Sequence, residues 1–408
     1  MTEVIEKSEN KKGYKKTKLG WIPENWEVVK LGDIATEIKD KVGARQRTPM
    51  SLSAGKGFVA QAKKFGKDIA GKQYAQYTCL PPRTFAYNKG NSLKYPQGCI
   101  YQQPFDEEVA VPNVFICFEL DKNRCNNNFY EQLFKNNAQG KELFKYINSG
   151  VRNDGLLNLN DNNFFKIKLV LPPLKEQEKI AEILSAWDEG IETLEKLIEQ
   201  KEVLKSSLAQ KYFQRKNNLF SLKQYKLGEL FKNRKETNCC ELELLSVCDG
   251  LGIVPRAQLN AKDNSNEDKS KYLKVCVGDL AYNTMRMWQG RCGVSTYEGI
   301  VSPAYTVCIP KDNIDVDYMY YLFKTPHMIH DFWRYSQGIV DDTLNLKFNN
   351  FEVIKVWIPD KETQTKIAKL LKSYDEEIQL LNSKLEKLKE QKKGLMQKLL
   401  TGQIRVKV

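Results

Sequence analysis

The chain contains few residues of the kinds that hold metals or activate nucleophiles. Only two histidines, His327 and His330, occur among its 408 residues, and none of its ten cysteines shows C-x-x-C spacing. Structural and catalytic zinc sites need clustered Cys and His ligands, and a Ser-His-Asp or Cys-His arrangement needs a suitably placed histidine. We therefore expect neither a metal site nor a catalytic residue in this chain.

Three other kinds of segment are also missing. The sequence has no G-x-G-x-x-G or G-x-x-x-x-G-K-[ST] loop to hold a cofactor phosphate, and it has no apolar run of membrane-spanning length. The first residues, MTEVIEKSEN, are polar where a secretion signal would be apolar. These absences predict a cytoplasmic protein without a cofactor of its own, in which the cysteines stay reduced.

Basic residues are in excess. Lys and Arg number 64 against 51 Asp and Glu, which gives a formal net charge of +13. The hydrophobic fraction of 41% is sufficient for folded cores, and the length suits two globular domains. An excess of Lys and Arg suggests a polyanionic partner, although many soluble proteins are mildly basic. The distribution of the charge is therefore more informative than its total.

The sequence is internally repeated. The segment QEKIAEILSAWDEGIETL begins at Gln177, and QTKIAKLLKSYDEEIQLL begins at Gln364, at an offset of 364 − 177 = 187 residues. The match extends forward to Leu208 and Leu395 and backward to Pro172 and Pro359. Internal repetition at a fixed offset indicates that one structural unit occurs twice.

Both copies have the apolar spacing of long helices. In the second copy, apolar residues recur at alternating steps of four and three from Ile367 to Leu399 and are interrupted at Lys392. In the first copy, the corresponding seam is interrupted at Lys201 and Lys205. This spacing is typical of a coiled coil. Each helix should comprise about 40 residues and extend about 60 Å.

Shorter matches precede each helix. Lys30-Leu31-Gly32-Asp33 corresponds to Lys226-Leu227-Gly228-Glu229, and Ala86-Tyr87-Asn88 corresponds to Ala281-Tyr282-Asn283. Between these matches the two halves diverge. The sequence thus predicts a variable domain at 21–172, a spacer helix at 173–218, a second variable domain at 219–358 and a second helix at 359–402. A flexible arm at 1–20 and a tail at 403–408 complete the predicted chain.

The connections between these elements predict the arrangement of the helices. A compact domain commonly has its two ends close together, so the second helix should return along the first. We therefore expect an α/β protein in which two globular domains are separated by two long antiparallel coiled-coil helices. The whole would be an internal repeat with pseudo-two-fold symmetry.

One stretch of the first variable domain is strongly basic. Residues 41–94 contain eleven Lys and Arg but only one acid, Asp68, and several tyrosines are interspersed among them. Basic and polar side chains position DNA phosphates and read base edges. A solvated basic surface without a partner is the alternative. The candidate contacts here are Arg45, Arg47, Lys63, Lys64, Lys72, Asn88, Lys89 and Lys94, with Arg152 near the domain's edge.

The second variable domain contains the segment NTMRMWQGR. Its candidate contacts are Asn283, Arg286, Trp288, Gln289 and Arg291. Arginine can pair with guanine or phosphate, glutamine can pair with adenine, and tryptophan can stack or wedge. For Trp288 a place in the core is an equally good interpretation. Trp333, Arg334 and Tyr335 lie in an expected helix, where we predict packing roles.

Two different DNA-reading domains on one rod predict a split target. Each domain would read a few base pairs, and the helices would set the number of unread base pairs between them. The target should be asymmetric because the two variable domains differ.

The chain resembles the specificity subunit of type I restriction-modification systems. The resemblance rests on Leu171-Pro172-Pro173-Leu174, which leads into Glu176-Gln177-Glu178-Lys179-Ile180-Ala181, and on the ending that runs from Gln391 to Gly402. Trp21-Ile22-Pro23-Glu24-Asn25-Trp26 and Ser302-Pro303-Ala304-Tyr305 also fit, so the resemblance covers nearly the whole chain.

This resemblance implies two target-recognition domains that bind double-stranded DNA. It also implies that the helices dock two methyltransferase (modification) subunits and that ATP-dependent restriction subunits complete the assembly. Catalysis and cofactors would belong to those partners. A specificity subunit of a related phage-defence or type II-like system and a coiled-coil scaffold that binds proteins are the alternatives. A stand-alone methyltransferase or nuclease is disfavoured because its motifs are missing.

Overall fold

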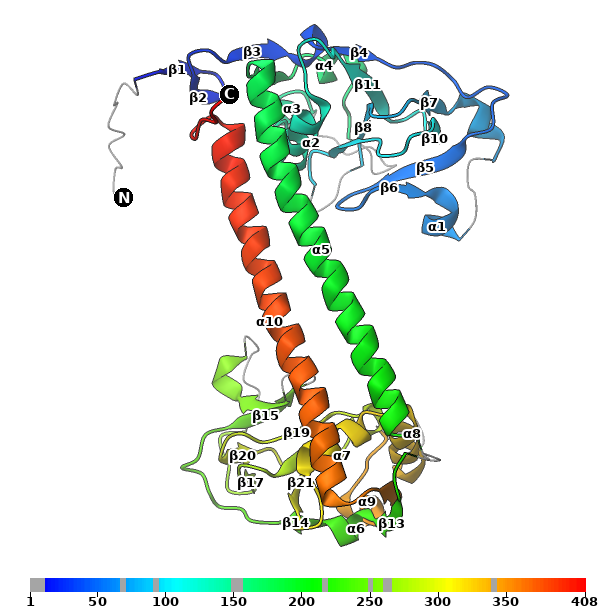
Figure 1. Cartoon of the computed structure of the whole chain (residues 1–408), viewed down its shortest axis with the longest axis vertical. Coiled ribbons are helices and arrows are strands. Elements are labelled where there is room, and N and C mark those ends of the chain that lie inside the picture. The colour runs from blue at the N-terminus through cyan, green and yellow to red at the C-terminus, as the bar shows by residue number, and fades with distance from the viewer. Residues whose placement is uncertain are drawn as a thin grey trace. The chain divides into compact units, whose positions relative to one another are not determined.

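The computed structural model of the chain contains two compact units. It describes residues 12–66, 71–90, 95–147, 157–214, 219–248, 252–259, 266–338 and 343–408. Unit 1 comprises Met1–Thr193 and Leu385–Val408, and unit 2 comprises Leu194–Lys384. The two longest helices, α5 (Leu174–Tyr212, 39 residues) and α10 (Lys361–Leu400, 40 residues), each contribute to both units (Figure 1).

Two four-stranded sheets form most of unit 1. The first has the order β4 (Ala35–Glu37), β11 (Ile116–Leu120), β8 (Phe85–Asn88) and β9 (Cys99–Gln102), with all neighbours antiparallel. The second has the order β6 (Gly57–Ala60), β5 (Thr48–Ser53), β10 (Val109–Val111) and β7 (Thr78–Leu80), with β5 and β10 parallel. Two further antiparallel pairs are β1 (Tyr14–Thr17) with β2 (Gly20–Pro23) and β3 (Glu27–Lys30) with β12 (Lys168–Leu171).

Short helices cover the first of these sheets. They include α2 (Asn127–Lys135), α3 (Gly140–Phe144) and α4 (Asp161–Phe164), and η1 (Leu31–Asp33) contributes Leu31 to the same core. The unit also contains α1 (Gln61–Phe65) and η2 (Gly71–Gln76). The amide N–H of Phe129 donates to the side chain of Asn126 at 3.0 Å, which caps the start of α2. Apolar residues of α2 then pack against the strands, so this face forms the main core of unit 1.

Unit 2 contains one four-stranded sheet and three antiparallel strand pairs. The sheet has the order β14 (Phe231–Arg234), β21 (Tyr305–Pro310), β18 (Leu280–Asn283) and β19 (Cys292–Val294). The pairs are β15 (Leu245–Cys248) with β16 (Gly252–Pro255), β17 (Leu273–Val275) with β20 (Gly299–Val301), and β13 (Lys223–Lys226) with β22 (Lys355–Ile358). The short helices among its described residues include α6 (Leu227–Leu230), α7 (Val316–Phe323), α8 (Pro326–Tyr335), α9 (Phe348–Phe351), η3 (Arg256–Gln258) and η4 (Met287–Gln289).

The repeat seen in the sequence is also present in the fold. The sheets β4-β11-β8-β9 and β14-β21-β18-β19 have the same strand order. A short helix follows the equivalent strands β11 and β21 in the chain, α2 in unit 1 and α7 in unit 2. The matching glycines explain part of the repeated sequence. The N–H of Gly32 donates to the carbonyl of Phe165 at 2.9 Å, and the N–H of Gly228 donates to that of Glu352 at 2.9 Å. A Cβ on Gly228 would lie 2.9 Å from the Cβ of Glu352, so this close approach needs glycine.

In each unit, the start of one long helix packs with the end of the other. In unit 1, Ile180 and Leu184 of α5 share a core with Met396 and Leu399 of α10. In unit 2, Ile367 and Leu371 of α10 share a core with Phe213, which follows α5. The two helices therefore run antiparallel within each unit. No helix in the described segments has the length and hydrophobicity that crossing a membrane would require.

The hairpin at residues 14–23 and the end of the chain both have contacts within unit 1. We expected a flexible arm over residues 1–20, but residues 14–23 form the hairpin of β1 and β2. The hydroxyl of Tyr14 donates to the carbonyl of Gly402 at 2.7 Å, and Arg405 pairs with Glu176 at 2.7 Å. The Tyr14 bond thus joins the hairpin to the end of the chain, and the Arg405 pair joins the end of the chain to α5. Residues 1–11 lie outside the described residues.

Candidate nucleic-acid interface

Two of the predicted contact residues end equivalent central strands. Asn88 ends β8, and Asn283 ends β18. The side-chain oxygen of Asn88 accepts the N–H of Gly90 at 2.8 Å, and that of Asn283 accepts the N–H of Met285 at 3.0 Å. Such bonds to the backbone two residues ahead turn the chain out of a strand. Both asparagines therefore shape the loops in which the other candidates lie.

The loop after β18 presents polar side chains around a buried anchor. Met287 is fully buried, whereas Gln289 and Arg291 are exposed and Arg286 is half-buried. The indole N–H of Trp288 donates to the carbonyl of Met285 at 3.0 Å, and Trp288 is itself half-buried. Trp288 thus supports the loop from within, while Arg286, Gln289 and Arg291 remain accessible to a partner.

Helix α8 packs beside this loop and corrects one prediction. A Cβ built on Gly290 would lie 3.2 Å from the Cδ1 of Ile329. We expected Trp333, Arg334 and Tyr335 to pack. Tyr335 is partly buried against the core, but Trp333 is 49% exposed and Arg334 is exposed. The buried positions of α8 include Met328, Asp331 and Phe332, so residue 333 lies outside the buried stripe. The helical spacing in the sequence could have revealed this.

The predicted lysines of unit 1 lie in different settings. Lys63 and Lys64 are exposed on α1, and the ammonium of Lys64 lies 5.1 Å from the ring centre of Phe65. Lys89 pairs with Asp161 at 3.0 Å, and its side chain is only 17% exposed. Lys94 and Arg152 lie outside the described residues, as does the side chain of Lys72. Of these lysines, Lys63 and Lys64 have the most accessible positions.

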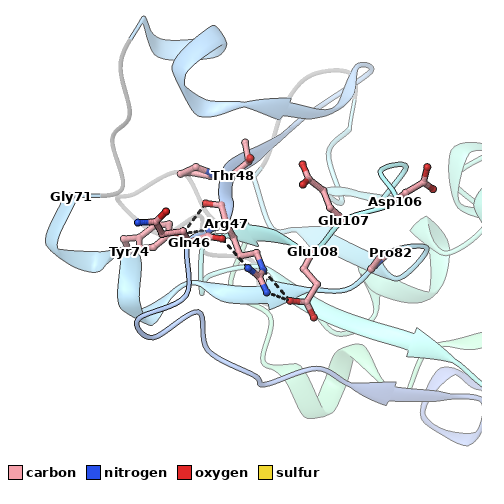
Figure 2. Close-up of a pocket in the computed structure, with 10 residues that line it drawn as sticks. Gln46, Arg47, Thr48, Gly71, Tyr74, Pro82, Asp106, Glu107 and Glu108 are labelled. Carbon is pink, nitrogen blue, oxygen red and sulfur yellow. Dashed lines mark hydrogen bonds and ion pairs between the residues drawn. The ribbon is translucent and has the colours of Figure 1, made fainter.

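Arg45 and Arg47, two of the three predicted arginines of unit 1, are held by carboxylates. Arg45 pairs with Asp40 at 2.8 Å. The Nε and Nη2 of Arg47 donate to one carboxylate oxygen of Glu108 at 2.9 and 2.7 Å, and Nη1 donates to the carbonyl of Gln46 at 2.9 Å. Figure 2 shows the side chains of Arg47 and Glu108 directed toward each other. Both arginines are therefore paired with acidic residues of the same unit.

Arg47 and Glu108 line a cavity of about 1030 Å³ together with Tyr74, Asp106 and Glu107. The hydrogen bond from Arg47 holds the pKa of the Glu108 carboxyl below its usual value, and the same bond raises the pKa of Arg47. Both groups therefore stay charged. Asp106, Glu107 and Glu108 lie outside the basic 41–94 stretch in sequence, and the fold brings them to it. Glu107 adds a third carboxylate beside the Arg47–Glu108 and Arg83–Asp106 ion pairs.

No group of three or more His, Cys, Asp or Glu side chains in the described part of the chain is arranged to hold a metal ion. No disulfide joins any of the ten cysteines, all of which the structure describes.

Comparison with known proteins adds to this description. A family profile described as the type I restriction modification DNA specificity domain matches residues 23–203 and 253–390. A relative from Methanocaldococcus jannaschii, named as a type I restriction enzyme MjaX specificity subunit, is 26% identical over 97% of this chain and 97% of its own length. The MjaVIII specificity subunit of the same organism is 24% identical over 95% of this chain and 94% of its own length.

A solved structure has the same fold. The crystal structure of a type I restriction-modification system S subunit from M. genitalium matches 92% of this chain and 96% of its own with a TM-score of 0.57, at 15% sequence identity. The family profile covers most of the chain, in two segments that include both halves of the repeat. The chain therefore belongs to the type I restriction-modification DNA specificity family, and its function is that of a specificity subunit.

Proposed function

We propose that each half of the chain reads one half of an asymmetric, split DNA target. The recognition domains would occupy residues 21–172 and 219–358, and the helices at 173–218 and 359–402 would be the spacer. The observation that carries this proposal is the repeated scaffold with divergent loops. The sheets β4-β11-β8-β9 and β14-β21-β18-β19 have the same order, whereas the loops that follow β8 and β18 differ in sequence.

Side chains in these loops and beside them would make the contacts with DNA. In unit 2, Arg286, Gln289 and Arg291 are accessible next to a strand end that Asn283 fixes. Arginine and glutamine are residue types that read guanine and adenine in the major groove. In unit 1, Lys63 and Lys64 have accessible positions, and Lys94 and Arg152 stay predicted contacts. Lysine contacts with phosphate would position the duplex without reading its sequence.

The reaction chemistry would belong to partner subunits. The long helices would dock two methyltransferase subunits, and ATP-dependent restriction subunits would complete the assembly in the cytoplasm. This chain would contribute no catalytic residue and no cofactor. Its role is then to decide where the partners act.

Mapping of methylated bases tests this proposal. The chain would be co-expressed with the methyltransferase subunit of its own system in a host without DNA methylation, and the genome would be sequenced for modified bases. We expect one motif with two short fixed parts and a constant number of unread base pairs between them. If the chain and an active methyltransferase form a stable complex and leave no modified motif, the proposal is wrong.

A further inference from the structure

The apolar seam is interrupted at Lys201 and Lys205 in α5 and at Lys392 in α10. Lys205 and Lys392 occupy equivalent positions and have equivalent partners. In unit 1, the ammonium of Lys392 on α10 forms an ion pair with Asp188 on α5. The amide nitrogen of Gln132 on α2 donates to the other carboxylate oxygen of Asp188 at 2.7 Å. The Lys392 residue is 9% exposed, so this contact lies within the packed interface.

Unit 2 contains the same arrangement with the helices exchanged. The ammonium of Lys205 on α5 forms an ion pair with Asp375 on α10. The hydroxyl of Tyr321 on α7 donates to the other carboxylate oxygen of Asp375 at 2.7 Å. The offset of 187 residues that relates the two halves converts Asp188 into Asp375 and Lys205 into Lys392. The two polar layers are therefore equivalent, and both specify the same register between α5 and α10.

An apolar seam alone would leave that register weakly defined. Leu385 and Leu399 lie seven residues before and after Lys392 in the seam. Ile198 and Tyr212 lie seven residues before and after Lys205. A slip of one heptad would therefore still place apolar residues in the interface. It would, however, separate each lysine from its aspartate and leave partly buried charges without partners.

The geometry points to Lys205, Lys392, Asp188 and Asp375 as the residues that fix the register of the spacer helices, and we propose that they thereby set the number of unread base pairs in the target. This inference rests on the proposed function. A slip of one heptad moves a helix by roughly 10 Å, which is the length of about three base pairs of DNA. Gln132 and Tyr321 hold the carboxylates and act as positioning residues.

The test replaces both lysines by an apolar residue of similar length. The variant Lys205→Met with Lys392→Met would be co-expressed with the methyltransferase subunit, and the modified motifs would be mapped. We expect both half-sites to be retained, with at least one additional spacer length beside the original. The matched control is Lys179→Met with Lys366→Met. These two lysines are also related by 187 residues but pair within their own helices, with Glu182 and Glu362, so the control should keep one spacer length.

A charge exchange keeps the proposal falsifiable if the methionine variant does not fold. Lys205→Asp places like charges opposite each other and should reduce modification at least tenfold, and addition of Asp375→Lys should restore it with the original spacer. A methionine variant that folds and modifies only the original spacer length overturns the inference, as does a failure of Asp375→Lys to rescue. If the unaltered chain yields no split motif, the proposed function itself is wrong. This result differs from a failure of the register inference, in which the unaltered chain does yield a split motif.

Discussion

Gln177 and Gln364 make the same two hydrogen bonds in two different units. The side-chain oxygen of Gln177 accepts the N–H of Asn126 at 2.8 Å, and that of Gln364 accepts the N–H of Asp315 at 2.9 Å. Each amide nitrogen donates to a proline carbonyl five residues earlier, at 2.8 Å in both cases. Both glutamines are almost fully buried. They connect the start of each long helix to the capping residue of α2 or α7.

Replacement of either glutamine should destabilise its own unit. Gln177→Ala or Gln364→Ala leaves a buried backbone N–H and carbonyl without their partner, which should cost about 1–3 kcal/mol in the free energy of unfolding. Denaturant titration of each variant measures this quantity. Gln379→Ala, at an exposed position of α10, is the control and should change it by less than about 0.5 kcal/mol. Equal stability of the three variants would contradict the assigned role.

The end of the chain should stabilise unit 1 through Arg405. Its guanidinium donates to both oxygens of Glu176 at 2.7 and 3.0 Å, and the indole N–H of Trp26 donates to the same carboxylate at 3.0 Å. The Glu176 side chain is 2% exposed, so Arg405→Ala leaves a buried carboxylate without its cation. Because Arg405 is itself partly exposed, we expect a loss of about 2 kcal/mol, seen as a lower thermal midpoint. Arg405→Lys should lose less, and an unchanged midpoint for Arg405→Ala would refute the contact.

The Arg47–Glu108 pair predicts a specific response to pH. Because the pKa of Glu108 is lowered in the folded protein, the pair's contribution to the free energy of unfolding is fully present at pH values above the ordinary pKa of 4.5. It is lost as the pH falls through the lowered pKa. Arg47→Met should raise the pKa of Glu108 toward its ordinary value, as carboxyl-carbon NMR titration can measure. Arg83→Met, which removes the partner of the neighbouring Asp106, should leave the pKa of Glu108 in place. An equal shift in both variants would contradict this pairing.

Buried thiols should resist labelling. Burial raises the pKa of Cys117 to about 12 and the pKa values of Cys99 and Cys125 to about 11, whereas Cys240 is exposed. Since the thiolate is the reactive form, an aromatic disulfide reagent at pH 8 should label Cys240 first and should reach the other three only after unfolding. Mass spectrometry of digested protein identifies the labelled residues. Labelling of Cys117 in the folded chain would show that its environment is not as described.

The sequence predicted the long-range plan better than the local contacts. Apolar spacing over about 40 residues is a strong signal for a long helix, and the structure has α5 at Leu174–Tyr212 and α10 at Lys361–Leu400. The strands are three to six residues long and pair across distant segments, as β5 does with β10, so periodicity could not give their order. The sequence shows Lys205 and Lys392 only as interruptions of the apolar seam, whereas the structure shows that each lysine pairs with an aspartate of the other helix.

The environments of the predicted DNA contacts could be predicted from the sequence even less well than the strand order. Arg47 and Glu108 are 61 residues apart in the chain, so a count of charges over 41–94 could not show that the arginine is already paired. Asn88 and Asn283 stay predicted DNA contacts, and in the structure their side-chain oxygens also accept backbone N–H groups that shape their loops. Trp333 was assigned to packing although the buried positions of α8 leave it outside. Short loops between strands carry little periodic signal, so such assignments need the structure.

The most direct test of the central claim is whether each unit reads its own half-site. Two variants, Arg286→Ala with Gln289→Ala in unit 2 and Lys94→Ala with Arg152→Ala in unit 1, would each be co-expressed with the methyltransferase subunit, and their methylated motifs would be mapped. We expect the first variant to relax base preference in one half-site only and the second to affect only the other half-site, with the spacer unchanged. Relaxation of both half-sites by either variant, or a single uninterrupted motif, would contradict the account.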